Sequence, residues 1–245
     1  MKRITILSDN CNTWNKKDFA NIADFDLECG SCSAYGSFSY VQTKYVWRWE
    51  IDIPYSWHFG EWEEIRLYPT RVQVVWIRCD LCGELHRLYP SFMLRGTTLT
   101  LSALVFIAYI YESSDLTWRE IPEKFCDAAD RIAHSTLFKA VHGLGRSLVE
   151  NERIRGAVAE LANRYPALGS WPPDKSRYAH TLNREHSLRD LLWPLLPYKS
   201  TESFTAFFFQ YLRPLRMLLS GLSPPIHPLY PNFIETALCP PEVIY

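Results

Sequence analysis

The sequence predicts an α+β fold, in which a small antiparallel β zinc ribbon with long hairpin arms precedes a mostly α-helical region containing a helix-turn-helix. Three observations predict it: two CxxC pairs 46 residues apart, strand-like alternation between them, and helical periodicity after the second pair. We expect three parts. These are a zinc-ribbon β domain with an N-terminal extension (1–95), a helix-turn-helix-like domain (96–149) and a helical C-terminal region with an irregular Pro-rich tail (150–245).

Composition and charge indicate an ordinary globular protein. Hydrophobic residues make up 47% of the 245 residues and charged residues 22%, and the formal net charge is −1. A polyanionic partner would therefore need a local basic face. The N-terminus lacks the apolar segment of a secretory signal, and the longest apolar run, 99–111, is too short to cross a bilayer. We expect a cytoplasmic protein with no membrane association.

The cysteine pairs are the most specific chemical signal. Four of the seven cysteines form CGSC (Cys29, Cys32) and CDLC (Cys79, Cys82). In a reducing compartment such pairs more often hold metal than disulfides. Two thiolates can turn inward on one tight knuckle, and two knuckles complete a tetrahedron around one structural Zn²⁺. A redox-active dithiol is the competing interpretation, but it places a CxxC at a strand-to-helix turn, whereas strand, turn and strand are predicted around CDLC.

The segment between the pairs is predicted to bring them together. Alternation predicts a half-buried strand over 45–53, a loop over 54–62, a weaker strand over 62–68 that Pro69 interrupts, and a strand over 71–79. Strands that fold back on themselves would return Cys79 toward Cys32. His58 and His86 are candidate replacement ligands, but four cysteines already satisfy zinc, so we expect surface or half-buried histidines.

Three helices are predicted after the second pair. Helical spacing over 99–111 predicts a buried helix, and Thr117 and Glu120 form a capping box for a helix through Phe125 that Pro122 keeps short or kinked. Ser135 is expected to cap a third helix, and two glycines, Gly143 and Gly145, predict its end near His142. Its inner side would carry Leu137, Ala140, Val141, Leu144 and Leu148.

The last two of these helices indicate a helix-turn-helix, in which the N-terminal part of the last helix enters the major groove of DNA. Small polar and basic residues occupy the corresponding positions. The candidate DNA-binding residues are Arg131, Ser135, Thr136, Lys139, His142 and Arg146. A helical bundle with ordinary solvated faces remains the alternative.

The order of these parts resembles a prokaryotic family of unknown function whose members look like the N-terminal zinc-ribbon and helix-turn-helix portion of transposases. The resemblance covers about 27–148 and depends on RCDLCGELHRLYPSFML, on TWREIPEKF and on the STLFKAVHGLGR that begins at Ser135. It implies zinc at the four paired cysteines and DNA contact through the last helix. The long segment between the pairs and the serine after the first pair depart from the family pattern.

The C-terminal region carries no recognisable catalytic motif, since GxxxxGK, HExxH and GxSxG are all absent. We therefore expect a binding protein and not an enzyme. The apolar segment Phe204 to Leu222 is predicted to be a core helix kinked by Pro214, or else a homodimer or protein-partner interface.

Two function classes remain open. The first is a zinc-dependent, mobile-element-associated factor that reads duplex DNA. The second is a protein-interaction or single-stranded nucleic-acid-binding module, in which bases would stack on aromatic strand residues. Those residues are Tyr45, Trp47, Trp49, Trp57, Trp62 and Trp76.

Overall fold

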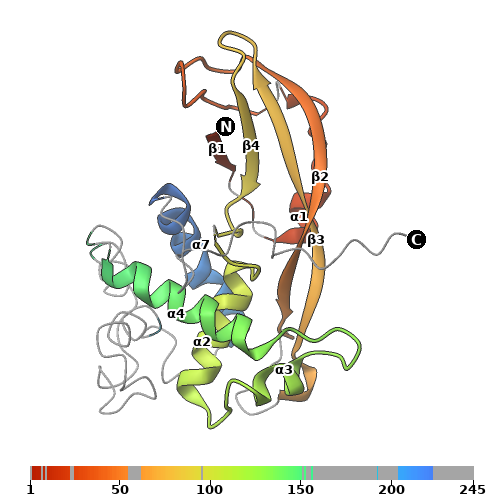
Figure 1. The fold of residues 1–245 in the computed structure, drawn as a ribbon, viewed down its shortest axis with the longest axis vertical. Coiled ribbons are helices and arrows are strands. Elements are labelled where there is room, and N and C mark those ends of the chain that lie inside the picture. The colour runs from red at the N-terminus through yellow and green to blue at the C-terminus, as the bar shows by residue number, and fades with distance from the viewer. Residues whose placement is uncertain are drawn as a thin grey trace.

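A computed structural model gives the fold (Figure 1). It describes residues 2–6, 8, 10–22, 25–54, 62–94, 96–150, 152, 156, 192 and 204–222. A tall sheet carries the helical region at one end, which we call the lower end, and two cysteine-bearing turns at the other, upper end. No helix among the described residues is both long and apolar enough to cross a membrane.

The sheet has four strands in the order β1-β4-β3-β2. They are β1 (Lys2–Ile6), β2 (Phe38–Asp52), β3 (Arg66–Cys79) and β4 (Leu85–Pro90). β2, β3 and β4 pair antiparallel, whereas β1 runs parallel to β4. The α+β class is therefore confirmed. The sheet is mixed and not purely antiparallel, because the N-terminal segment, which we expected to be an extension, supplies an edge strand.

β2 and β3 form a long two-stranded arm whose register runs from Phe38 opposite Cys79 to Asp52 opposite Arg66. Pro69 lies within β3 opposite Trp49, so the expected interruption there is wrong. The reason is the pairing. Trp49 directs its backbone N–H and C=O away from β3, to Thr98 and Thr100. The Trp49–Pro69 pair is therefore one that makes no hydrogen bond between the strands, so the sheet loses no hydrogen bond through the absent N–H of Pro69.

Five helices are described: α1 (Cys11–Asn15), α2 (Leu101–Ser113), α3 (Glu120–Phe125), α4 (His134–Glu150) and α7 (Phe204–Leu222). A 3-10 turn, η2 (Trp62–Glu64), precedes β3. The predicted buried helix is α2, capped by Thr100, whose hydroxyl accepts from Ala103 N–H. The capping box forms as expected, with Thr117 N–H donating to Glu120 at 2.7 Å, but α3 begins only at Glu120. Pro122 therefore falls in its first turn, where the missing N–H of proline needs no helical partner.

α4 differs from the prediction at both ends. Its first turn begins at His134, with Ala133 C=O accepting from Thr136 N–H, so Ser135 lies inside the helix and does not cap it. The helix also continues through Gly143 and Gly145 to Glu150, because both glycines are buried and packing outweighs their low helix propensity. Of the five predicted inner residues, four are buried, namely Leu137, Ala140, Val141 and Leu144, and the side chain of Leu148 lies outside the described part of the structure.

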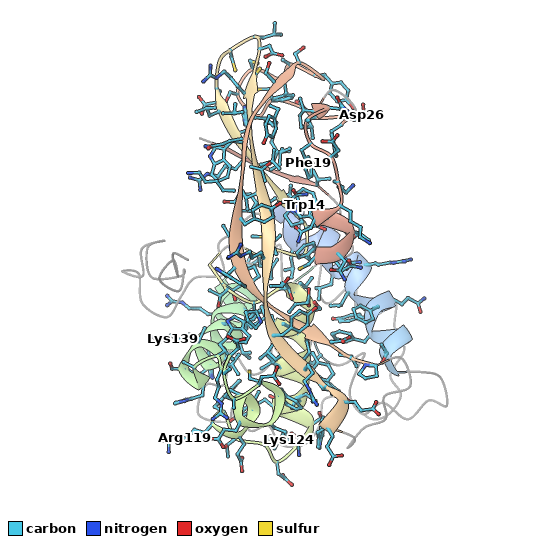
Figure 2. All side chains as sticks on the ribbon, turned by 90° about the vertical axis from the view of Figure 1, so that its right-hand side faces the viewer. Trp14, Phe19, Asp26, Arg119, Lys124 and Lys139 are labelled. Carbon is cyan, nitrogen blue, oxygen red and sulfur yellow. The ribbon has the colours of Figure 1, made fainter. Side chains whose placement is uncertain are left out.

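Two hydrophobic clusters hold the molecule together. The lower cluster joins the lower end of the arm, through Ile51 and Leu67 among others, to α2, α3, α4 and α7. The upper cluster packs the N-terminal segment, including Trp14 and Phe19, on one face of the sheet (Figure 2). α7 contributes five buried side chains to the lower core, as expected for a core helix: Phe208, Tyr211, Leu212, Leu215 and Leu219.

Candidate metal centre

Two turns at the upper end of the sheet present the four paired cysteines. Each turn has the same two backbone hydrogen bonds. In the first, Cys29 N–H donates to Ala34 at 2.8 Å and Ser33 N–H donates to Cys29 at 2.8 Å. In the second, Cys79 N–H donates to Glu84 at 3.0 Å and Gly83 N–H donates to Cys79 at 2.8 Å. The CGSC and CDLC segments are therefore equivalent knuckles despite their different sequences.

The residue after each second cysteine adopts the left-handed conformation that closes the knuckle. Gly83 has φ 73° and Ser33 has φ 56°. The serine that departs from the glycine pattern thus takes the backbone conformation that glycine favours, at some conformational cost.

The two knuckles bring their sulfur atoms together. All four Sγ atoms, from Cys29, Cys32, Cys79 and Cys82, lie within 4.8 Å of one another. The separation is 3.6 Å between Cys29 and Cys82 and 3.7 Å between Cys32 and Cys79. A tetrahedron with Zn–S bonds of about 2.3 Å has edges of about 3.8 Å, so the cluster has the size and the donor set for a four-thiolate metal site. The predicted convergence of the two pairs is confirmed, and the paired strands of the arm, which end on Phe38 and Cys79, achieve it.

The surroundings make the thiols unequal. Burial favours the neutral form of Cys29, but hydrogen bonds, above all from the backbone N–H groups of Cys32 and Ser31, lower its pKa to about 6. A hydrogen bond from Glu84 N–H favours the thiolate of Cys82, but burial and the neighbouring thiols raise its pKa to about 12. Cys29 is therefore the first of these two thiols to become an anionic ligand.

His86 is a contact that sequence reasoning missed. We expected a surface or half-buried histidine, but His86 is 0% exposed and its Nε2 lies 3.3 Å from Cys29 Sγ. Its Nδ1 is buried without a hydrogen-bond partner, and its ring packs edge-on against Phe38. The burial of His86 could have been predicted from the alternation along β4, because Leu88, two residues later on the same face, is also buried. His58 lies outside the described residues.

The candidate DNA-binding residues lie on and before α4, at the lower end. Arg131 and Ser135 are exposed, whereas Thr136, Lys139 and Arg146 are half-buried. His142 is 1% exposed and its ring lies 4.0 Å from that of Phe138, so it lies inside the helical packing. The exposed polar surface therefore gathers at the start of the helix.

A buried carboxylate, which the sequence did not single out, joins three elements below the metal centre. Glu50 on β2 is 7% exposed and accepts hydrogen bonds from Thr100 at 2.8 Å, from Ser102 and from the Cys11 thiol at 3.4 Å. Burial, followed by the charge of Glu50, raises the pKa of Cys11. The thiol therefore stays protonated and donates to the carboxylate.

No protein-family model, no curated protein and no solved structure matches this chain. The functional argument therefore depends on the residues themselves.

Proposed function

We propose that this protein is a zinc-dependent DNA-binding protein of the kind that accompanies mobile elements, with one structural zinc ion and a helix-turn-helix formed by α3 and α4. The observation that carries the proposal is the four-thiol cluster, because four sulfur donors at tetrahedral spacing favour Zn²⁺. The ion would fix the N-terminal knuckle to the turn between β3 and β4, far from the helices (Figure 1). Its role is therefore structural.

The helical region supports the second half of the proposal. α3 and α4 are successive helices separated by residues 126–133. Trp118, two residues before α3, connects that part of the chain to both neighbouring helices, because it stacks on Tyr111 of α2 and packs edge-on against Phe138 of α4. α4 leaves its N-terminal turn exposed, as a recognition helix requires. Within this proposal Arg131 and Ser135 make the first contacts with duplex DNA. Lys139 and Arg146 approach the phosphates, and the buried His142 supports the helix from inside.

Metal analysis tests the zinc half. We expect about one zinc per chain in the purified protein. The ion should be lost when all four paired cysteines are replaced by serine, together with ordered structure in the upper sheet. A fully folded wild-type protein that contains no metal would overturn this half of the proposal.

Salt-dependent binding tests the DNA half. Log affinity for duplex DNA should fall linearly with log salt, and Lys139→Ala with Arg146→Ala should reduce the slope by about 1.8, at roughly 0.9 per phosphate contact. Lys16→Ala with Arg213→Ala removes the same charge from two exposed positions, one directly after α1 and one on α7, and should leave the slope unchanged. Equal effects of the two pairs would show that α4 is not the contact.

A homodimer or protein partner bound through α7 stays a separate prediction. Phe209, 39% exposed, and Arg213 are exposed side chains of that helix. An oligomeric state that Phe209→Ser abolishes would support it.

A further inference from the structure

The upper part of the sheet has a charge distribution unlike that of the whole chain. The strand segments 2–6, 39–48, 70–78 and 85–89 contain seven Lys or Arg residues and no Asp or Glu. The rest of the chain contains the other 19 of the 26 basic residues and all 27 acidic residues. The upper part of the sheet in this nearly neutral protein is therefore strongly basic, whereas the acidic residues Glu50 and Asp52 lie in the lower part of β2.

Strand register places four of these seven on one face. Lys44 pairs with Val74, Arg48 with Thr70, Arg78 with Leu85, and Trp76 with Arg87, which is also the register partner of Arg3. Directly paired residues share a face, and alternate residues along a strand do too. We call this surface the basic sheet face and define it by Lys44, Arg48, Trp76, Arg78 and Arg87, with Arg3 at the neighbouring register position.

Trp76 occupies the middle of this face. Lys44 Nζ lies 5.6 Å from the centre of its ring and Arg87 Cζ lies 5.1 Å from it, so cations from β2 and β4 flank an indole on β3. Lys44 and Arg78 are exposed, and Trp76 and Arg87 are half-buried. An aromatic surface with phosphate-binding cations on both sides is thus already assembled.

No described helix covers the basic sheet face around Trp76, although Val72 and Val74, farther down the same face of β3, are buried. α1 and the N-terminal segment cover the other side, where Trp14 Nε1 donates to the Gln73 carbonyl and the Gln73 amide donates to the Trp14 carbonyl. Figure 2 shows Trp14 and Phe19 on that covered side, and Figure 1 shows no described helix in front of the upper strands.

We propose that the basic sheet face binds single-stranded nucleic acid, with an unpaired base stacked on Trp76 and phosphates held by Lys44, Arg78 and Arg87. The charge of the face calls for a polyanion, and the indole adds a surface on which any base can stack. Four strands about 4.8 Å apart make a sheet about 14 Å wide, which cannot enter a major groove of about 12 Å. The bases of a duplex are therefore out of reach, whereas those of a single strand are not.

The proposal also revises the predicted stacking residues. Trp49 and Trp62 pack against the lower core, and Trp57 lies outside the described residues. Trp47 lies on the opposite face under Arg71, whose Cζ is 4.9 Å from its ring centre. Among the predicted aromatic residues, Trp76 is the one that lies between cations of the basic sheet face. This site does not depend on α4 or on the proposed reading of duplex DNA.

Fluorescence anisotropy with a labelled oligothymidylate, alone and annealed to its complement, tests the proposal on the full-length, metal-loaded chain. Trp76→Ala should weaken single-strand binding about 5- to 150-fold, and Trp76→Phe should restore most of it. Lys44→Ala with Arg87→Ala should lower the salt slope by about 1.4, at roughly 0.7 per phosphate on a single strand. Lys139→Ala with Arg146→Ala should leave single-strand binding unchanged.

Arg71→Ala is the matched control, because it removes an arginine from above a tryptophan in the same arm but on the covered side. It should leave affinity unchanged. Unchanged zinc content and circular dichroism establish that each variant is folded. If Trp76→Ala misfolds, Lys44→Ala with Arg87→Ala still tests whether the basic sheet face binds the single strand. Three results would overturn the proposal: no single-strand binding by the wild type, an equal loss with Arg71→Ala, or an equal loss of duplex binding in the Trp76 and Lys44–Arg87 variants.

Discussion

His86 is a buried side chain that contacts the cysteine cluster without belonging to it. Its Nε2, 3.3 Å from Cys29 Sγ, can donate a hydrogen bond to a metal-bound thiolate, and the burial of the ring prevents water from replacing it. Partners of this kind orient a ligand and reduce the repulsion among four thiolates. The contact lies on the buried half of the centre, since Cys29 and Cys79 are 0% exposed, whereas Cys32 and Cys82 are exposed.

We expect His86→Ala to weaken zinc binding about 10- to 100-fold, because the Cys29 thiolate loses its donor while all four sulfur ligands remain. Competition with a chromophoric chelator measures this. His134→Ala, at an exposed histidine that begins α4, should leave zinc affinity unchanged. His86→Gln, whose amide N–H lies at a similar distance from the backbone, should recover part of the affinity. If alanine and glutamine variants bind zinc as the wild type does, the hydrogen bond contributes nothing to the centre.

At the scale of elements, Glu50 connects α1, β2 and α2. Its carboxylate accepts from the Thr100 hydroxyl, and the same hydroxyl caps the first turn of α2. From the other side, the Cys11 thiol of α1 reaches the same carboxylate. If the side chain were removed, the buried Cys11 thiol would lose its acceptor, and the Thr100 and Ser102 hydroxyls, 3.1 Å apart, would keep only each other as acceptors.

Glu50→Ala should therefore lower the free energy of unfolding by about 3 kcal/mol, since it leaves the Cys11 thiol and one of the two hydroxyl donors without an acceptor. Glu50→Gln keeps an acceptor oxygen and should cost less. Urea denaturation of the metal-loaded protein measures both, with Glu64→Ala, at an exposed glutamate in η2, as the neutral control. A cost for Glu50→Ala no larger than that for Glu64→Ala would show that the buried carboxylate does not hold the three elements together.

Local chemistry predicted much of these elements, and long-range packing decided the rest. The two CxxC pairs predicted the cysteine cluster, and the Thr117–Glu120 box predicted a short helix close to where α3 begins. The continuation of α4 past Gly143 and of β3 through Pro69 could not be predicted, because each depends on partners distant in sequence. The same holds for the parallel pairing of β1 with β4, since five residues at the N-terminus carry no signal of the strand that they join.

At the scale of the whole molecule, the two proposed nucleic-acid surfaces lie at different heights on one side of the sheet. The basic sheet face belongs to the upper end, and Lys139 of α4 lies at the lower end on the side away from Trp14 and Phe19 (Figure 2). The lower core connects them, since β2, β3 and α4 all contribute to it. A nucleic acid with both a duplex part and an unpaired strand could then occupy both surfaces at once.

We accordingly expect a duplex with a single-stranded tail to bind more tightly than either the blunt duplex or the free strand. Once one part is bound, the other is held at a high effective concentration, which can raise affinity by roughly 10²- to 10⁴-fold if the tail spans the gap. Anisotropy titrations over a series of tail lengths measure this. Affinity should rise steeply once the tail reaches the second surface and then fall slowly.

Trp76→Ala should remove the gain from the tail and leave blunt-duplex binding intact. Lys139→Ala with Arg146→Ala should weaken blunt-duplex binding and leave binding of the free strand intact. A tailed duplex that binds no better than its stronger part would show that the two surfaces do not act on one nucleic acid.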